Sequence, residues 1–488
     1  MLVGMDERPN IPDAVPKASR DPLPEVARFL KPFAPLFRRA QSRHSLERYI
    51  TGLLTDLDRK NCDTISAAVA GTSTERLQHL LTDADWDSLK LDGARVRSLS
   101  AKSPEGGILV LDDTSLPKQG KSSVGVARQY CGALGKRADC QVVVSAQYVA
   151  NEPESSRPLH WPVNAQLYLP EEWAKDRERR ERAHVPEEVH FRSKPQIALS
   201  LVDLSREWGV PFGVVVADSG YGKYPMFLGG LEQRELPYVC GVESTFGVRQ
   251  PEEVRAAKEA GAPPYRGRGQ PPKERPAPLY TAREVLGSLP EQAWRTVAWR
   301  EGTKGTLSKQ IVAVRAHRAT GSDRHSTTHE RVLTAEEGWL IAERPLVVRS
   351  KNREDLPGEE EELKYYYSSL GADVSLERLA ALAHSRWAIE QFYEDAKGEC
   401  GLGDYQGRRW DGLHRHLAVV MVAYSFLMVH SSWVLGQDRS SEEESFPPLS
   451  GGQARDAASD SQAGTGVVAG GSGGVVHPNR EDKNLSPS

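Results

Sequence analysis

The sequence predicts an α/β protein with a helical region at its N-terminus, and three patterns support that fold class. Apolar residues repeat at helical spacing across residues 21–100. Across residues 101–247, short apolar runs that end in turn residues alternate with helix-like stretches. Residues 248–335 then combine Pro- and Gly-rich segments with basic, strand-like ones. At 488 residues, the chain is long enough for two or three domains.

The sequence predicts neither a membrane-spanning segment nor a secretion signal. No run of about 20 apolar residues occurs, and the longest one, residues 417–429, has the length of a buried helix. Residues 1–20 are polar and Pro-rich, which predicts a flexible N-terminus without the apolar stretch of a signal peptide. The five cysteines are widely spread without a CxxC pair, so we expect reduced thiols and a cytoplasmic protein.

The net charge of −4 lies in the C-terminal tail. Residues 437–488 carry eight acids and four bases, whereas residues 1–436 carry 59 charges of each sign. The tail is Gly- and Ser-rich without periodicity, which predicts a disordered, low-complexity segment. Because the rest of the chain is neutral, net charge does not exclude a nucleic-acid partner, and the local distribution of charge has to decide.

Four helices are expected near the N-terminus. Two carry apolar residues at helical spacing within residues 29–37 and 46–57, a third follows Asp63, and a fourth follows the turn at residues 71–73. Basic residues recur among them, so residues 21–100 are interpreted as a small helical, DNA-binding domain. A solvated helical face without a partner is the alternative interpretation.

The first part of the α/β core is predicted in residues 101–247. The expected elements are strands over residues 108–111, 141–149, 159–169, 213–217 and 238–242, with an amphipathic helix over residues 197–208. Such apolar runs are typical of central strands that are buried on both faces. Residues 336–436 supply the second part of the core.

Residues 248–335 interrupt the core as a basic, β-rich insertion. Within it, residues 293–320 carry six bases and one acid, with two tryptophans among them. A basic β surface with aromatic side chains suits contact with a nucleic-acid backbone. The residues singled out as DNA-binding are Arg295, Trp299, Arg300 and Lys304. An exposed β-ribbon with ordinary basic side chains is the alternative.

Two predicted strands each end in an aspartate, Asp112 after Leu111 and Asp218 after Ala217. An acid at the carboxyl end of a buried strand lies at the rim of the sheet, where α/β proteins place their chemistry. Taken singly, each aspartate is more often a turn residue or a helix cap. The pair gains meaning only with a third acidic residue.

That third residue lies on a helix expected over residues 376–397. At about 100° per residue, Arg386, Glu390 and Lys397 fall within about 40° of one another. They lie beside an apolar stripe formed by Leu376, Leu379, Ala380, Ala383 and Trp387. Glu394 falls on the stripe itself. Charged residues are rarely buried unless they are paired or functional. An Arg386–Glu390 ion pair at the edge of a solvated face is the alternative.

Two strand-end aspartates and a helix glutamate suit a site for divalent cations. Three carboxylates that converge on one point repel one another, and Mg²⁺ or Mn²⁺ bound by their oxygens relieves that repulsion. Two such ions about 4 Å apart activate an attacking water or hydroxyl and stabilise the departing 3′ oxygen of a phosphodiester. Arg386 and Lys397 would then contact phosphate oxygens.

The order Arg386-x3-Glu390-x6-Lys397 resembles the Tyr-Arg-Glu-Lys signature of bacterial insertion-sequence transposases of the DDE superfamily, the cut-and-paste group with a β-rich insertion. Three further segments are similar to that family, and they cover residues 111–120, 123–132 and 216–222. The resemblance extends over about residues 107–416. It implies an RNase H-like catalytic core with an Asp-Asp-Glu triad.

The resemblance assigns the triad of metal ligands to Asp112, Asp218 and Glu390. Asp112 is preferred because the family's Asp-x-Thr pattern then includes Thr114. The adjacent Asp113 is the alternative, since strand alternation lets only one of the two face the metal.

Two features depart from the family pattern. Ala383 stands where the signature has Tyr, and residues 437–488 differ from the family's folded C-terminal segment. The family also uses an aromatic residue of the insertion to stack on a flipped base. The candidates here are Trp294, Trp299 and Trp339.

The resemblance implies the function of a DDE transposase. Such a protein would bind the terminal inverted repeats of its element through the N-terminal helices, cleave phosphodiester bonds, and join 3′-OH ends to target DNA. It would act as a dimer on double-stranded DNA in a bacterial cytoplasm, at the nucleoid. Two alternatives remain: a catalytically inactive or repurposed DNA-binding protein, and a Mg²⁺-dependent DNA endonuclease without strand transfer.

Overall fold

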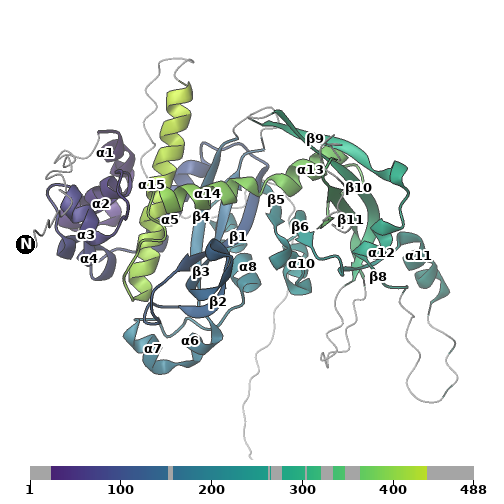
Figure 1. Cartoon of the computed structure of the whole chain (residues 1–488), viewed down its shortest axis with the longest axis horizontal. Coiled ribbons are helices and arrows are strands. Elements are labelled where there is room, and N and C mark those ends of the chain that lie inside the picture. The colour runs from purple at the N-terminus through teal and green to yellow at the C-terminus, as the bar shows by residue number, and fades with distance from the viewer. Residues whose placement is uncertain are drawn as a thin grey trace, which may run out of the picture. The chain divides into compact units, whose positions relative to one another are not determined.

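The computed structural model describes residues 24–151, 158–261, 264, 267, 277–302, 305–319, 334–346 and 363–436. This part of the chain has a mixed α/β fold, as the sequence predicts (Figure 1). Three predictions fall outside it, and they concern the flexible segment 1–20, the disordered tail 437–488 and Lys304.

Helices form in the N-terminal region where they are expected. They are α1 (Pro24–Leu30), the 3₁₀ turn η1 (Lys31–Leu36), α2 (Ala40–Leu53), α3 (Cys62–Ala68), α4 (Thr74–Thr82) and α5 (Ser88–Ser100). The side chains of Asn61, Ser73 and Asp87 accept backbone N–H bonds in the first turns of α3, α4 and α5, which fixes where these helices begin. Their apolar residues share one core with the C-terminal helices.

The first six strands build the centre of the sheet. They are β1 (Gly107–Pro117), β2 (Ala127–Cys131), β3 (Lys136–Val149), β4 (His160–Tyr168), β5 (Phe212–Ala217) and β6 (Tyr238–Val242). β1 pairs antiparallel with β3 and parallel with β5, and β5 pairs parallel with β6. The expected core strands are therefore all confirmed. The helices between β4 and β6 are α6 (Glu171–Lys175), α7 (Arg177–Arg182), α8 (Lys194–Glu207), α9 (Ser219–Gly222) and α10 (Pro225–Glu232).

The predicted insertion extends this same sheet. Its elements are β7 (Gly247–Arg249), α11 (Pro251–Ala260), β8 (Tyr280–Thr281), α12 (Ala282–Gly287), η3 (Glu291–Ala293), β9 (Arg295–Gly302), β10 (Gly305–Ala319) and β11 (Thr334–Arg344). β12 (Lys364–Ser368) then joins β11 to β6, so the sheet order in the described residues is β2-β3-β1-β5-β6-β12-β11-β10-β7-β8. β11 crosses the predicted boundary at residue 335, because it stays paired with β10 as far as Arg344.

Alternation along the central strands divides the core into two layers. In β1, Ile108 and Val110 pack against the C-terminal helices on one face. Leu109 and Leu111 pack with α8 and α10 on the other face. Any residue that follows in β1 therefore faces one layer or the other according to its position in this alternation.

The helix expected over residues 376–397 is in fact two helices, α13 (Leu376–His384) and α14 (Trp387–Gly398). A tighter turn causes the break, because the backbone N–H and the hydroxyl of Ser385 both donate to the carbonyl three residues earlier. Angles counted from residue 376 therefore do not continue into α14. Glu394, expected on the apolar stripe, is exposed, so that prediction is wrong.

α15 (Trp410–Gly436) is the longest of the described helices. Residues 410–430 are long and apolar enough to cross a membrane, with a mean hydropathy of 1.4 in their most apolar window, but 72% of that window is buried inside the protein. Burial of this kind is typical of a core helix, so the prediction of a buried helix over residues 417–429 is confirmed.

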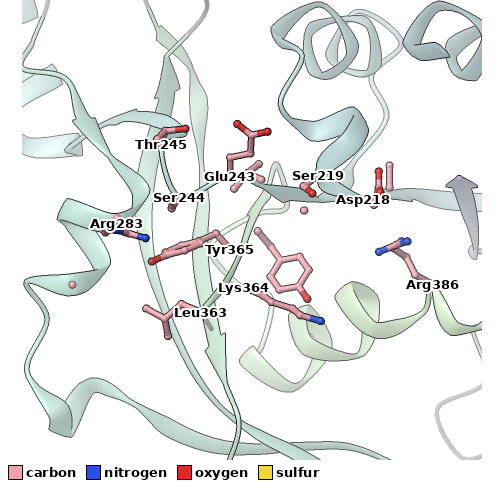
Figure 2. A pocket seen from close by; sticks show the side chains of 15 residues that line it. Asp218, Ser219, Glu243, Ser244, Thr245, Arg283, Leu363, Lys364, Tyr365 and Arg386 are labelled. Carbon is pink, nitrogen blue, oxygen red and sulfur yellow. The ribbon is translucent and has the colours of Figure 1, made fainter. Parts of the chain in front are cut away.

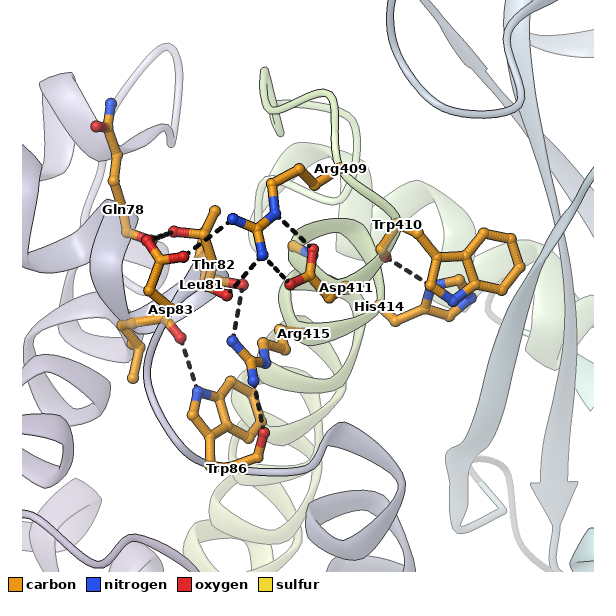
Figure 3. A network of polar contacts seen from close by, with 12 residues as sticks. Gln78, Leu81, Thr82, Asp83, Trp86, Arg409, Trp410, Asp411, His414 and Arg415 are labelled. Carbon is orange, nitrogen blue, oxygen red and sulfur yellow. Dashed lines mark hydrogen bonds and ion pairs between the residues drawn. The ribbon is translucent and has the colours of Figure 1, made fainter. Parts of the chain in front are cut away.

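Polar contacts attach the start of α15 to the N-terminal helices (Figure 3). Arg409 Nη1 lies 2.9 Å from Asp83 Oδ1, and Arg409 Nη2 lies 2.6 Å from Asp411 Oδ2. Arg415 Nη2 donates a 2.8 Å hydrogen bond to Trp86 O. These bonds join the segment between α4 and α5 to the helix that crosses the core.

Candidate active site

The two predicted aspartates come together where the parallel pairing of β1 and β5 ends. Leu111 and Ala217 are the last partners in that register, so Asp112 and Asp218 follow side by side. β5 ends there, but β1 does not end at Asp112 as the sequence suggested. It continues to Pro117, because β3 pairs with it along that whole length. Asp112 is thus a strand residue beside the point where β5 stops.

Asp112 and Asp113 point to opposite faces of β1. Asp112 shares the face of Ile108 and Val110, which α14 covers. Asp113 Oδ2 lies 2.8 Å from Lys194 Nζ, and its Oδ1 accepts a 3.1 Å hydrogen bond from Tyr221 OH. This placement favours Asp112 as the site residue.

Arg386 lies between Asp112 and Glu390. It occupies the corner between α13 and α14, and its Nη2 lies 2.8 Å from Asp112 Oδ2 and 3.4 Å from Glu390 Oε1. The Glu390 side chain is 62% exposed. Figure 2 shows the Arg386 guanidinium near Asp218 at one end of a cavity. The Arg386–Glu390 ion pair of the alternative interpretation exists, but it belongs to a larger acidic cluster.

The negative charge of the two aspartates is only partly compensated. Burial raises the pKa of Asp112 to about 7 against the lowering effect of Arg386, and the charge of Asp218 raises it further. Burial raises the pKa of Asp218 as well, again against Arg386. Asp218 Oδ1 is buried without a hydrogen-bond partner among the residues that the structure describes. A buried acid pair with an unsatisfied oxygen fits a site for a divalent cation.

The third carboxylate is less closely placed. Within the described ranges, no group of three or more His, Cys, Asp or Glu side chains is arranged to hold one metal ion. Glu390 is linked to Asp112 through Arg386. The triad of Asp112, Asp218 and Glu390 therefore stays a prediction. The structure adds that Glu390 projects from the helix that covers the face of Asp112.

Lys397 lies further along α14, over the same face of β1. Its Nζ donates a 2.6 Å hydrogen bond to Thr114 Oγ1, two residues after Asp112. Burial lowers the pKa of Lys397. Tyr393, which lies between Arg386 and Lys397 in the sequence, has its OH 2.6 Å from Ser145 Oγ on β3. These contacts fix α14 across the central strands, and with it the position of Arg386.

Two of the predicted DNA-binding residues contact the corner between α13 and α14. The Trp299 ring stacks on His384 with the ring centroids 4.0 Å apart. Arg300 Cζ lies 4.5 Å from the centre of the Trp387 ring. Arg300 Nε and Nη1 are buried without a hydrogen-bond partner in the described part of the chain. Strand β9 therefore reaches the edge of the acidic site.

The other predicted DNA contacts are placed differently. Arg295 is exposed on β9, and Lys304 lies outside the described residues. The rings of Trp294 and Trp339 are each covered by an arginine guanidinium, at 4.3 and 4.9 Å. Trp299, by contrast, lines a cavity of about 480 Å³ at the acidic site.

Glu343 is a buried acid that no sequence pattern indicated. Its Oε1 lies 2.6 Å from Lys309 Nζ and its Oε2 lies 2.7 Å from His384 Nε2. Burial raises the pKa of Glu343, but its hydrogen bonds and ion pairs with His384 and Lys309 lower it to about 2. The three residues come from β11, β10 and α13, so their association has no local signal. Together they attach the extended sheet to the helix corner.

Two cavities meet at Arg386. The larger one, of about 1080 Å³, includes Asp218 and Arg283 (Figure 2). The smaller one, of about 480 Å³, includes Trp299 and Glu390. The residues that line both are Lys364, Tyr366 and Arg386. The acidic cluster is thus reached from two sides.

Close backbone contact fixes the turn after Asp218. A Cβ on Gly222, at the end of α9, would lie 2.0 Å from Gly241 O on β6. A Cβ on Gly241 would lie 2.8 Å from Ser219 N. A side chain at either position would push backbone apart, so the contact between α9 and β6 defines where Asp218 lies.

Buried aspartates beside basic side chains at the edge of an α/β sheet are the arrangement expected of nucleases that use metal ions to displace a phosphodiester. Residues 32–306 match the family model of the DDE superfamily endonucleases, and residues 192–426 match that of the transposase DDE domain. The chain belongs to the DDE superfamily of endonucleases.

Part of the chain is also similar to a probable transposase for insertion sequence element IS701 from Microchaete diplosiphon. The two are 29% identical over 215 residues, which make up 44% of this chain and 52% of the relative. The chain therefore spans about half the length of this relative.

Proposed function

We propose that this chain is the transposase of an insertion sequence, which cleaves DNA at the ends of its element and transfers the strands to target DNA. The observation that carries the proposal is the buried pair Asp112 and Asp218 on one face of the sheet, with Arg386 and Lys397 beside it. Membership of the DDE endonucleases and the similarity to an insertion-sequence transposase support it.

The finer architecture is part of this proposal. The central strands β1, β3, β5 and β6 with α14 would form an RNase H-like core, and residues 248–335 a β-rich insertion. The chain leaves the core after β6 and returns through β12, which pairs with β6, in support of this division. The helices of residues 21–100 would form the N-terminal domain that binds DNA.

Members of this superfamily depend on divalent cations. Here the ion would be Mg²⁺ or Mn²⁺, held by Asp112, Asp218 and Glu390, with Asp113 as the alternative to Asp112. Bound there, the ion would supply the positive charge that activates an attacking water or hydroxyl and stabilises the departing 3′ oxygen. Asp218 Oδ1, which has no hydrogen-bond partner in the described part of the chain, and the raised pKa values of both aspartates support this assignment.

Arg386 and Lys397 would bind the scissile phosphate. Arg386 Nε is buried without a hydrogen-bond partner among the described residues, so the guanidinium has a donor left for a phosphate oxygen. Lys397, held by Thr114, places a second cation over the same face of β1. The two side chains orient the phosphate and stabilise the negative charge that develops on its oxygens.

The smaller cavity would hold the element's end beside that phosphate. Trp299 lines it and is proposed, among the three candidate tryptophans, to stack on the flipped base. Arg300 contributes two donors, Nε and Nη1, that have no hydrogen-bond partner among the described residues. Arg295 and Lys304 would contact the DNA backbone, and the N-terminal helices the terminal inverted repeats. The protein would act as a dimer on double-stranded DNA, at the nucleoid of a bacterial cytoplasm.

The test compares the wild-type chain with Asp218→Asn and with Asp203→Asn as a matched control. Asp203 lies on α8 in an ion pair with Arg234, outside the site. The substrate is a supercoiled plasmid that carries the DNA from both sides of the reading frame, with Mg²⁺. We expect wild type and control to nick it and to form joined strands. Asp218→Asn loses at least about a thousandfold in cleavage rate, since the ion supplies several kcal/mol.

Other outcomes would point elsewhere. Cleavage that survives Asp218→Asn contradicts the proposed mechanism. Hydrolysed ends without joined strands from the wild-type chain would identify a Mg²⁺-dependent endonuclease. Binding without any cleavage would identify an inactive or repurposed DNA-binding protein.

A further inference from the structure

The larger cavity at Arg386 is a polar groove with cations along its length (Figure 2). It extends from Asp218 and Arg386 to Arg283 on α12, with Lys364 of β12 between them. Arg283 and Lys364 are exposed, and neither forms an ion pair with any residue that the structure describes. These two charges are therefore available to a ligand.

Hydroxyl groups line the groove as well. Ser219, Ser244 and Thr245 belong to its lining, and their side chains make no hydrogen bond within the described ranges. Glu243 is the acid of this lining in addition to Asp218, and it lies 3.6 Å from Lys223 Nζ, which offsets its charge. Away from Asp218, the groove thus presents positive charge and free hydroxyl donors.

This lining suits a nucleic-acid backbone better than a small molecule. Pockets for small molecules are mostly apolar and rarely exceed about 1,000 Å³. The groove has about 1080 Å³ and is lined largely by charged residues, hydroxyls and glycines. Arg, Lys, Ser, Thr and backbone N–H groups are the usual contacts to DNA phosphates.

Strand transfer requires two DNA strands at one site, a 3′-OH end and the phosphodiester that it attacks. The smaller cavity is assigned to the element's end, and the groove leads away from Asp218 on the other side of Arg386. We infer that the groove binds the backbone of the target strand, with Arg283 and Lys364 on its phosphates. This inference rests on the proposed transposase activity.

The reaction at this junction balances without an external energy source. The 3′ oxygen of the element's end forms a bond to the target phosphorus, and the bond from that phosphorus to the target's own 3′ oxygen breaks. The attacking hydroxyl releases its proton to water, and the departing oxygen takes one up from water. Arg283 and Lys364 contact neither oxygen and hold phosphates of neighbouring nucleotides.

The test separates transfer from cleavage in the variant Arg283→Gln, because Arg283 lines the groove alone whereas Lys364 also lines the cavity assigned to the element's end. Its matched control, Lys258→Gln, removes one exposed lysine outside the groove and changes the net charge equally. Cleavage is measured on the plasmid with the flanking DNA, and transfer with precleaved ends and a separate supercoiled target. We expect the groove variant to cleave within about twofold of wild type and to lose at least about tenfold in transfer.

A second readout measures the ionic contacts directly. The complex of protein and precleaved ends is titrated with target DNA at several salt concentrations. Each phosphate contact contributes about −0.9 to the slope of log K against log[salt], so the slope of the groove variant should be shallower by about 0.9. The control variant should keep the wild-type slope.

The outcomes distinguish target DNA, the element's own DNA and no DNA as the ligand of the groove. An equal loss of cleavage and transfer places the element's own DNA in the groove and overturns the target assignment. Transfer and salt slope that both match the control overturn a DNA groove altogether. Failure of the proposed function looks different, because the wild-type chain itself would then join no strands.

Discussion

Adjacent residues on one strand have different surroundings at the site, as Asp112 and Asp113 show. Alternation along β1 directs Asp112 toward Arg386 and Asp113 toward Lys194 and Tyr221. Asp113 therefore has a cation and a hydroxyl of its own. Asp112 shares its cation with other acids, which leaves charge for a bound ion to neutralise.

We expect Asp112→Asn to abolish DNA cleavage and Asp113→Asn to retain most of it. In Asp113→Asn the hydrogen bond from Tyr221 survives and the ion pair with Lys194, whose side chain is 36% exposed, is lost. The free energy of unfolding then falls by about 1 kcal/mol or less. Nicking rates and urea unfolding of both variants check this. If cleavage stops in Asp113→Asn and persists in Asp112→Asn, the roles of the two aspartates are exchanged.

At the scale of elements, the corner between α13 and α14 depends on the extended sheet. Glu343→Gln breaks the buried ion pairs of this contact but keeps partly exposed partners, so the free energy of unfolding at pH 7 should fall by about 1–3 kcal/mol. Folding lowers the pKa of Glu343 to about 2. Its contribution is therefore complete above the ordinary Glu pKa of about 4.3 and is lost as the pH falls through about 2.

The measurement for Glu343→Gln is urea unfolding of wild type and variant at several pH values. The difference between them should be constant from about pH 7 to 5 and shrink below about pH 4. A difference that stays the same down to about pH 2 would contradict the charged role of Glu343. Retained stacking of Trp299 on His384, seen in tryptophan fluorescence, would show that the corner itself persists.

Elements with strong local signals could be predicted from the sequence. Strands β1, β3 and β5 and helix α8 form where continuous apolar runs and helical periodicity indicate them. The break between α13 and α14 at Ser385 could not be predicted, because neither Gly nor Pro marks it and apolar residues continue on both sides. The position of β12 between β6 and β11 could not be either, since it depends on pairing between segments far apart in the chain.

The residues of the site also fall into two groups, those that the sequence predicts and those that it does not. Asp112, Asp218 and the charged residues of α14 were found because they follow strands or share one helix face, and because their order resembles a known family. Glu343, Lys194 and Tyr221 were missed. Each acts through a partner from another element, and single-sequence patterns carry no information about such contacts.

At the scale of the whole molecule, the N-terminal helices and the site-bearing helices share one hydrophobic core. Helices α2, α4 and α5 contact α15. The buried Lys60 ammonium donates to Leu53 O at the end of α2 and to Glu399 O at the end of α14. The predicted division at residue 100 is therefore not a division of the core.

Removal of residues 1–100 should prevent the remaining chain from folding. The apolar side of α15 would lose its cover and become exposed, and large exposed apolar surfaces promote aggregation. We expect residues 101–488 to be largely insoluble and to show no cooperative thermal transition, whereas the full chain shows one. Solubility, size-exclusion chromatography and calorimetry check this. A soluble monomeric fragment with its own cooperative transition would establish two independent domains.

The tight packing of Gly222 against Gly241 has a consequence for the proposed transposase, because it limits which sequence changes an active copy can carry. Under the proposed transposase function, we expect a copy that still transposes to keep glycine at both positions, because a Cβ there would shift the turn that carries Asp218. A copy that no longer transposes is expected to accumulate alanine, serine or larger residues at positions 222 and 241 as freely as at other positions. Sequencing these two codons across the copies in one genome would therefore distinguish active copies from inactive ones, even where every acidic residue of the site is still present.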